Sequence, residues 1–339
     1  MLMKHRLMSA AIALALSATG AQAAVSAADA AKLGSTLTPF GAEKAGNADG
    51  SIPAWTGGIT QAPAGYKGSG QHHIDPFPDD KPLFTITKAN LEQYKDKLSA
   101  GQIALFNAYP ESFQMPVYQS RRSGSAPQWV YDNSIKNATS AKLVEGGNGF
   151  ADAYGGIPFP IPQSGLEALW NHIVRYRGTY ITRRSVEAAV QRSGAYSPVV
   201  SEVEALFRYY DPKGSYADLN NILFYYLNFT KSPARLAGGA ALVHETLDQV
   251  KEPRQAWAYA AGQRRVRRAP NLAYDTPIAA SEGLRTADDT DMFNGSPDRY
   301  EWKLLGKKEL YIPYNNYRVS AAVSYTHLRC RRIERCRSR

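Results

Sequence analysis

Apolar and polar positions alternate most clearly in the second half of the chain. Between residues 199 and 211 the alternation has a period of two, which is typical of a strand with one solvent-facing side. The apolar positions are Val203, Ala205, Phe207 and Tyr209, and they are separated by Glu202, Glu204 and Arg208. Residues 222–231 are apolar or aromatic at nearly every position, which predicts a strand covered on both faces.

The stretch from Gln255 to Pro270 predicts a hairpin. Trp257 and Tyr259 share one face of its first strand, and Ala261-Gly262 supplies a turn, since glycine reaches positive φ without steric cost. The returning strand is dense in guanidinium groups. They belong to Arg264, Arg265, Arg267 and Arg268.

Further strands are expected at 128–134, 140–145, 173–183, 240–250, 299–303 and 309–312. Helices are expected at 26–33, 87–98 and 99–109, and a short one after Ser164. Because the strands follow one another through short connections, they predict an antiparallel meander and not βαβ units. The expected fold is α+β and β-rich: a curved antiparallel sheet, or incomplete barrel, with helices covering its concave side.

Residues 34–82 contain many glycines and prolines and no hydrophobic period. They predict an extended arm anchored by Ile52, Trp55 and Ile59, with a flexible linker as the alternative. The domain organisation follows from these shifts in composition. A signal peptide is expected at 1–23, the arm and helices at 24–117, the sheet domain at 118–319 and a tail at 320–339.

The two ends carry most of the positive charge. Lys4 and Arg6 precede a short apolar run and Ala21-Gln-Ala23, which together predict a secretory signal peptide cleaved near Ala23. The tail holds six arginines, one glutamate and both cysteines, a net charge of +5. Since the ends account for +5 and +2 of the net +10, residues 25–319 carry only +3. The tail is interpreted as a non-native end, with a nucleic-acid or membrane-binding segment as the alternative.

The candidate binding residues fall into two groups. The first comprises possible walls of a ligand cavity, for which ordinary core packing is the alternative. Its members are Trp257, Tyr259, Phe207, Tyr209, Phe224 and Tyr226. The second comprises Arg264, Arg265, Arg267 and Arg268, which would meet anionic head groups or an acidic partner, with a solvated, salt-bridged sheet face as the alternative.

Catalytic and metal-binding signals are weak. The acidic stretch at 288–294 has the wrong order for an EF-hand, and a turn or helix-cap role is favoured. His72-His73 with Asp75 lacks a third ligand at useful spacing. Because the sequence contains no nucleophile elbow, P-loop or dinucleotide fingerprint, we expect neither an enzyme nor a bound cofactor or metal.

Several motifs together resemble the DUF1329 family of exported bacterial proteins. They are Asn47-Ala-Asp-Gly-Ser-Ile-Pro-Ala-Trp-Thr-Gly-Gly58, Gly156-Ile-Pro-Phe-Pro-Ile-Pro162, the Gln255–Arg268 hairpin, Asp288-Asp-Thr-Asp-Met-Phe-Asn-Gly295 and Gly306-Lys-Lys-Glu-Leu-Tyr-Ile-Pro-Tyr-Asn-Asn316. The resemblance covers roughly residues 1–319. It implies a fold related to the LolA/LolB outer-membrane lipoprotein-sorting carriers, and further strands beyond Val319 in other family members.

The resemblance also shapes the functional expectation. It implies a periplasmic protein, associated with the outer membrane, that is often encoded beside an efflux-type transporter and an outer-membrane barrel and would serve them. The predicted function is a carrier or chaperone that holds a hydrophobic small molecule or an acyl chain in a sheet-lined cavity. The alternative is an interaction module without cargo that docks a membrane transport complex. No nucleic-acid partner and no membrane span in the mature chain are expected.

Overall fold

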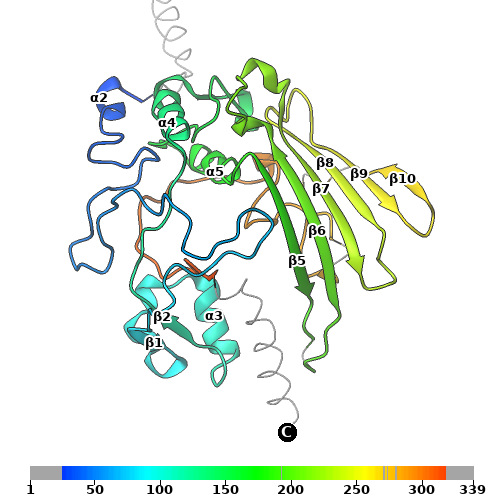
Figure 1. Ribbon diagram of the computed structural model, residues 1–339, viewed down its shortest axis with the longest axis horizontal. Coiled ribbons are helices and arrows are strands. Elements are labelled where there is room, and N and C mark those ends of the chain that lie inside the picture. The colour runs from blue at the N-terminus through cyan, green and yellow to red at the C-terminus, as the bar shows by residue number, and fades with distance from the viewer. Residues whose placement is uncertain (1–24, 192, 270–271, 273, 279–280, 318–339) are drawn as a thin grey trace, which may run out of the picture.

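The fold is built on a six-stranded antiparallel sheet, seen in a computed structural model that describes residues 25–191, 193–269, 272, 274–278 and 281–317 (Figure 1). Its strands run β10-β9-β8-β7-β6-β5 across the sheet, so each pairs with its neighbour in the sequence. They are β5 (Tyr180–Ala188), β6 (Pro198–Phe207), β7 (Ile222–Ser232), β8 (Ala240–Thr246), β9 (Gln255–Ala260) and β10 (Arg265–Arg268). The predicted α+β fold with an antiparallel meander is confirmed, and the described strands form an open sheet.

The predicted hairpin forms, but its turn is longer than expected: residues 261–264 connect the strands, and the positive φ lies at Arg264 and not at Gly262. Strands β9 and β10 pair in the register Trp257↔Arg268 and Tyr259↔Val266. Arg264 occupies the turn with a φ of 50°. The hairpin ends the sheet, because β10 pairs only with β9 among the described strands.

The two faces of the sheet have different surroundings. We call the inner face the side that carries Val203, Phe224 and Tyr226, and the outer face the side that carries Leu206, Leu227 and Leu242. Helices α4 (Gln128–Ser140) and α5 (Gly165–Ile173) lie on the inner side, as Figure 1 shows.

The main hydrophobic core fills the space between α5 and the inner face. Leu169, Trp170 and Ile173 pack there with Phe207 and other inner-face side chains. Trp170 is fully buried, and its indole N–H donates to the Gly147 carbonyl at 2.9 Å. Ser164 caps α5 as predicted, since its hydroxyl accepts from the Glu167 N–H at 3.2 Å.

Residues 285–302 cover more of the inner face. Arg285 donates to both carboxylate oxygens of Glu187 on β5, and Arg177 bonds to Asp291. Phe293 and Trp302 pack against the main core. This segment contains the acidic stretch 288–294, where the Asp288 carboxylate accepts from the Thr286 hydroxyl at 2.6 Å, as in a turn.

Five strand predictions are wrong or need correction. Residues 128–140 form α4, and only Lys142–Leu143 (β3) is extended, pairing with Phe150–Ala151 (β4). The strand expected at 173–183 begins later, at Tyr180, because α5 continues to Ile173. Residues 299–303 and 309–312 form no strand.

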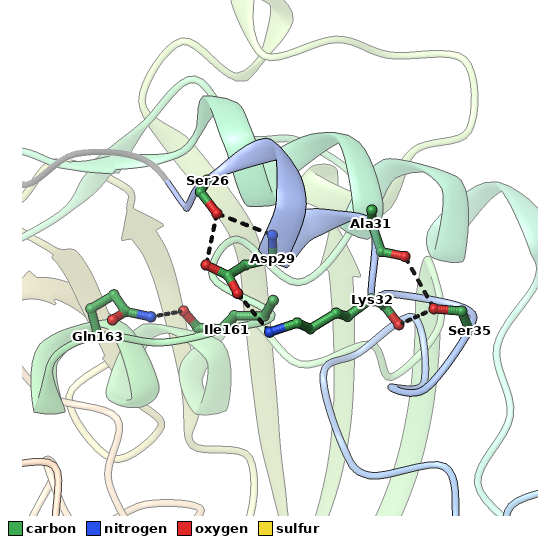
Figure 2. Close-up of polar contacts among 7 residues, drawn as sticks. All are labelled: Ser26, Asp29, Ala31, Lys32, Ser35, Ile161 and Gln163. Carbon is green, nitrogen blue, oxygen red and sulfur yellow. Dashed lines mark hydrogen bonds and ion pairs between the residues drawn. The ribbon is translucent and has the colours of Figure 1, made fainter.

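The first described helix, α2 (Ala27–Ala30), is shorter than the predicted 26–33. Figure 2 shows its cap: the Ser26 hydroxyl accepts from the Asp29 N–H and donates to the Asp29 carboxylate, which also binds Lys32 at 2.7 Å. Beyond the helix, Ser35 donates to the carbonyls of Ala31 and Lys32. In the same view Gln163 donates to the Ile161 carbonyl in the segment that precedes α5.

The arm that follows is fixed by contacts with residues 122–124. The Trp55 indole donates to the Gly124 carbonyl at 3.0 Å, and the Ile59 N–H donates to the Ser123 carbonyl at 2.9 Å. The guanidinium of Arg122 donates to several arm carbonyls. Trp55 and Ile59 therefore serve as predicted anchors.

A second, smaller core holds the N-terminal helical unit together. Its buried residues are Ile86, Leu91, Leu98 and Phe106. Its elements are β1 (Phe84–Ile86), the 3-10 helices at Lys88–Gln93 and Lys95–Lys97, α3 (Ala100–Ala108) and β2 (Met115–Val117). Ser99 and Gln102 form a capping box at the start of α3.

Residues 302–315 connect the two cores as an extended strap. Close to α5, the strap backbone at Trp302 and Lys303 lies against Gly165, where a Cβ would meet the Trp302 carbonyl carbon at 2.6 Å. Tyr311 packs in the second core, and its N–H donates to the Lys97 carbonyl at 2.9 Å. The strap, although extended, bonds to loops and helix ends instead of a strand ladder.

Among the described residues, no helix combines the length and apolar character that crossing a bilayer requires. The predicted signal peptide and the tail from residue 320 onward lie outside the described residues.

Candidate functional site

A row of apolar side chains crosses the outer face from strand to strand. Leu227 on β7 pairs with Leu242 on β8, and Leu242 pairs with Trp257 on β9. Trp257 in turn pairs with Arg268 on β10. Directly opposed residues of antiparallel strands project to the same face, so these four side chains form one line, which we call the central row.

The central row is flanked on both sides by more apolar surface. Tyr225 and His244 form the adjacent pair on one side, and Phe229, Tyr259 and Val266 lie on the other. Phe229 and Tyr259 are 38% and 37% exposed, and Val266 is 63% exposed. None of these residues contributes to either described hydrophobic core, so the outer face of β7–β10 presents an apolar surface to solvent.

Aromatic contacts order one side of this surface. The imidazole of His244 lies between Tyr225 and Trp257, with ring centroids 4.6 and 4.8 Å away and steep interplanar angles. Partial burial lowers the pKa of His244 from its ordinary value, opposed by the charge of Glu252. A neutral imidazole keeps this part of the outer face apolar at neutral pH.

Charges on the outer face are distributed unevenly. On β6, Glu202 pairs with Lys231 at 2.8 Å and Glu204 accepts from the Tyr180 hydroxyl at 2.8 Å. On β10, Arg268 is exposed and forms no ion pair with any residue that the structure describes. Arg184 on β5 also lies on this face, but it is opposite Glu202 and its charge acts on that carboxylate, whereas Arg268 faces no carboxylate on the neighbouring strand β9.

The four hairpin arginines do not point the same way. Arg268 is the one on the outer face, in the central row, because it pairs with Trp257. Arg265 and Arg267 pair with Ala260 and Ala258 and therefore project to the opposite face. Arg264 lies in the turn, and all four are exposed.

The six aromatic candidates are divided between two faces. Trp257 and Tyr259 lie on the outer face, whereas Phe207, Phe224 and Tyr226 lie on the inner face. Tyr209 follows β6 in a 3-10 turn and is buried, and its hydroxyl donates to the Gly156 carbonyl at 2.8 Å. The structure therefore does not bring the six together around one space.

The inner-face aromatic residues are tightly packed. Phe207 and Phe224 are in tilted contact, with centroids 5.3 Å apart. The gap between α5 and these side chains measures about 10 Å³, roughly what one water molecule requires. In this arrangement Phe207, Tyr209 and Phe224 are core side chains, and the space beside them does not admit an acyl chain.

Another cavity, of about 240 Å³, lies in the arm between residues 59–74 and Tyr317. Tyr66 and His73 stack at its wall with centroids 5.8 Å apart. None of its lining residues belongs to the sheet. Within the described ranges, no three histidine, cysteine or acidic side chains gather where they could hold a metal ion.

Sequence reasoning missed the apolar partners of Trp257. Leu227, Leu242 and Tyr225 belong to strands that are apolar on both faces, so periodicity did not identify their side of the sheet. The register with Trp257 was the missing information. Counting outward from the predicted turn at Ala261-Gly262 would have aligned Trp257 with Val266 instead of Arg268, and it gives no register with β8.

Comparisons with known proteins agree with the sequence motifs. Residues 85–328 match a family described as "Protein of unknown function (DUF1329)". The chain is 54% identical over 312 residues to the uncharacterised protein PA3922 of Pseudomonas aeruginosa. That alignment covers 91% of this chain and 68% of the relative.

Two solved structures show partial similarity. A DUF1329 family protein from Desulfovibrio piger matches with a TM-score of 0.30 and 18% identity, over 40% of this chain and 50% of that one. A domain from Vibrio parahaemolyticus described as an outer membrane lipoprotein-sorting protein matches with a TM-score of 0.25 and 17% identity, over 35% of this chain and 46% of that one. The chain thus spans half or less of the length of these structures.

Proposed function

The chain belongs to the DUF1329 family, and we propose that it is an exported, carrier-type protein that binds a hydrophobic or acylated ligand on the outer face of its sheet. The periplasm is the proposed location, supported by the predicted signal peptide and by the lipoprotein-sorting description of the Vibrio parahaemolyticus domain. Transfer of the ligand to a transporter or an outer-membrane barrel is part of the same proposal.

The observation that carries the proposal is the uncovered apolar surface around the central row. Leu227, Leu242 and Trp257 are half-buried and lie in register across three strands. Each methylene taken from water onto such a surface contributes up to about 0.8 kcal/mol. A ten-carbon chain would then contribute at most about 8 kcal/mol before the costs of ordering and association are subtracted.

The tight inner face supports placing the ligand outside. A sheet-lined interior would need α5 to separate from Phe207 and Phe224, which would expose the main core. The outer face needs no such rearrangement. A ligand could enter from solvent and leave towards a partner without unfolding any described element.

The test is displacement of a fluorescent fatty acid from the purified full chain. We expect saturable binding in the native chain, and a loss of at least about tenfold in Leu242→Asp, which adds a charge to the central row. Val250→Asp is the matched control: Val250 is 66% exposed and lies after β8, outside the sheet. Equal binding by both variants, or no binding by the native chain, would refute the proposal.

A second candidate function is a docking module without cargo. It is favoured by the exposure of Arg264, Arg265, Arg267 and Arg268 on an edge hairpin, where no described residue neutralises them. Replacing the four arginines by serine separates the candidates. A docking module loses its membrane partner in a pull-down, whereas a carrier still binds the chain of its ligand.

We propose no enzymatic activity. Burial lowers the pKa values of His172 and His244, so these shifts need no reacting partner. The imidazole of His172 meets the Asp291 carbonyl at 2.8 Å, and His244 lies between two aromatic rings.

A further inference from the structure

We infer that the ligand of the outer face is a single-chain amphiphile with an anionic head group, and that it lies along the central row with its head group at Arg268. This inference rests on the proposed function and adds the charge and the orientation of the ligand. The proposed ligand is a monomeric anionic amphiphile, such as a fatty carboxylate.

The apolar part of the site has the length and direction that a chain requires. Leu227, Leu242, Trp257 and Arg268 lie on four consecutive strands in one register line. Neighbouring strands are about 4.8 Å apart, so the line spans roughly 14 Å. Phe229 and Tyr259 border it on one side, and Tyr225 and His244 border it on the other.

The two ends of the line differ in charge. Its β6 end is Glu204, which pairs with Leu227 and accepts a hydrogen bond from Tyr180. Its β10 end is Arg268, which is exposed and lacks an ion pair among the described residues. An anionic head group at the β6 end would meet a carboxylate, whereas at the β10 end it meets a free guanidinium. The orientation follows from this asymmetry.

A second copy of the chain fits the outer face less well. A copy laid across the row would need a free acidic group opposite Arg268. The two acidic side chains of this face, Glu202 and Glu204, are already engaged by Lys231 and Tyr180. A soluble anionic amphiphile brings its own negative charge, so it can pair with Arg268 without breaking the bonds of Glu202 or Glu204.

The experiment compares three twelve-carbon competitors against a fluorescent fatty acid on the full chain: dodecanoate, its methyl ester and dodecyltrimethylammonium. We expect dodecanoate to bind about three- to fivefold more tightly than the ester, the range for one ion pair at an exposed site, and the cation to bind most weakly. Arg268→Ser removes the preference for dodecanoate over the ester, and Arg268→Lys restores part of it.

Arg267→Ser is the matched control. It removes the same charge from the adjacent residue of β10, but Arg267 projects to the opposite face. We expect its preference for dodecanoate to stay within about twofold of the native value, because a fully exposed charge on the far face contributes little. Equal effects of the two serine substitutions would overturn the position of the head group at Arg268.

Other outcomes separate this inference from the function on which it rests. If the ester binds as tightly as dodecanoate, the inference fails and the carrier function stands. If none of the competitors binds, the carrier function itself fails. If the chain binds anionic vesicles but not monomeric dodecanoate, the outer face binds a membrane surface. If light scattering shows a dimer that Leu242→Asp dissociates, the outer face binds a second copy of the chain. Either result overturns the inference.

Discussion

Trp257 on β9 lies directly opposite Arg268 on β10, so the last apolar side chain of the central row adjoins the first exposed arginine of the sheet edge. The indole is half-buried, and the guanidinium is exposed. This pair places the apolar surface and the guanidinium of Arg268 in one continuous site. The proposed binding of an apolar chain and the proposed position of its anionic head group both depend on this adjacency.

Replacing Trp257 by alanine should weaken ligand binding more than folding. The ring contacts His244 at 4.8 Å and supplies apolar surface at the middle of the proposed site. Loss of that surface should cost about 1–2 kcal/mol of binding free energy, or roughly five- to thirtyfold in affinity. Competition binding and thermal unfolding would be measured on the same samples. A variant that binds normally would show that the ligand does not lie over Trp257.

The buried ion pair between Glu245 and Arg254 should be important for stability. Their side chains are 2% and 5% exposed, and the shortest nitrogen–oxygen distance is 2.7 Å. Burial raises the pKa of Glu245, and the charge of Arg254 opposes that shift. Arg254 also donates to the carbonyls of Leu272 and Asn294, so it holds these two residues beside the sheet.

Arg254→Met should therefore lower the free energy of unfolding by about 3–5 kcal/mol, because the carboxyl group of Glu245 stays buried without its partner. The double variant Glu245→Leu with Arg254→Met should recover part of this loss. Urea denaturation of the native chain, both single variants and the double variant gives the coupling energy. Strictly additive effects would show that the pair is not coupled.

The stability of the fold should fall as the pH drops through the ordinary histidine range. Burial, followed by the positive charge of Arg175, lowers the pKa of His172 from 6.5. The unfolded chain therefore takes up a proton at His172 at a higher pH than the folded chain does, and the folded state loses stability as the pH falls below about 6.5. Burial lowers the pKa of His244 in the same direction.

The variant His172→Gln should show a smaller loss of unfolding free energy between about pH 7.5 and pH 5 than the native chain does. Glutamine can still donate to the Asp291 carbonyl, so the hydrogen bond is kept while the titration is removed. Urea denaturation at several pH values measures the difference. Parallel pH profiles for the two proteins would mean that His172 titrates normally in the fold.

Tyr311 should control how firmly the strap is held. Its ring meets Phe84 and Tyr94 edge-on, each at 6.1 Å, and its N–H donates to the Lys97 carbonyl. Tyr311→Ala should accelerate tryptic cleavage at Lys307 and Lys308 by roughly tenfold, since about 1–2 kcal/mol of local packing is lost. Tyr314 is 52% exposed, so Tyr314→Ala should leave the cleavage rate unchanged.

The sequence was most informative where local chemistry alone determines structure. The existence of the hairpin between residues 255 and 268 follows from alternation around a glycine-containing turn, although its register does not. Helices α3 and α5 follow from Ser99 and Ser164 as caps. Strand β7 was predicted from its continuous apolar run. Those runs also hid which side chains share a face, because β7 and β8 are apolar on both sides.

Helix α4 was missed because its buried face is partly polar. Ser134 and Asn137 are buried on it, and both bond to the backbone of residues 154–157. Those bonds pair backbone groups of a loop that is distant in the sequence, so the hydrophobic pattern around residues 128–140 does not indicate them. The strand expected at 309–312 was wrong for a related reason: this part of the strap is extended, but the backbone of Tyr311 bonds to Lys97 and Gln102 of the N-terminal unit. The strand expected at 299–303 begins instead in a 3-10 helix at Pro297–Arg299.

Photo-crosslinking distinguishes a ligand on the outer face from a ligand inside the fold. A fatty acid with a diazirine in its chain would be irradiated with the full chain, and the labelled residues would be identified by peptide mass spectrometry. We expect adducts on Leu227, Leu242 and Trp257 that excess dodecanoate suppresses. Adducts on Phe207 and Phe224, beneath α5, would contradict a ligand on the outer face.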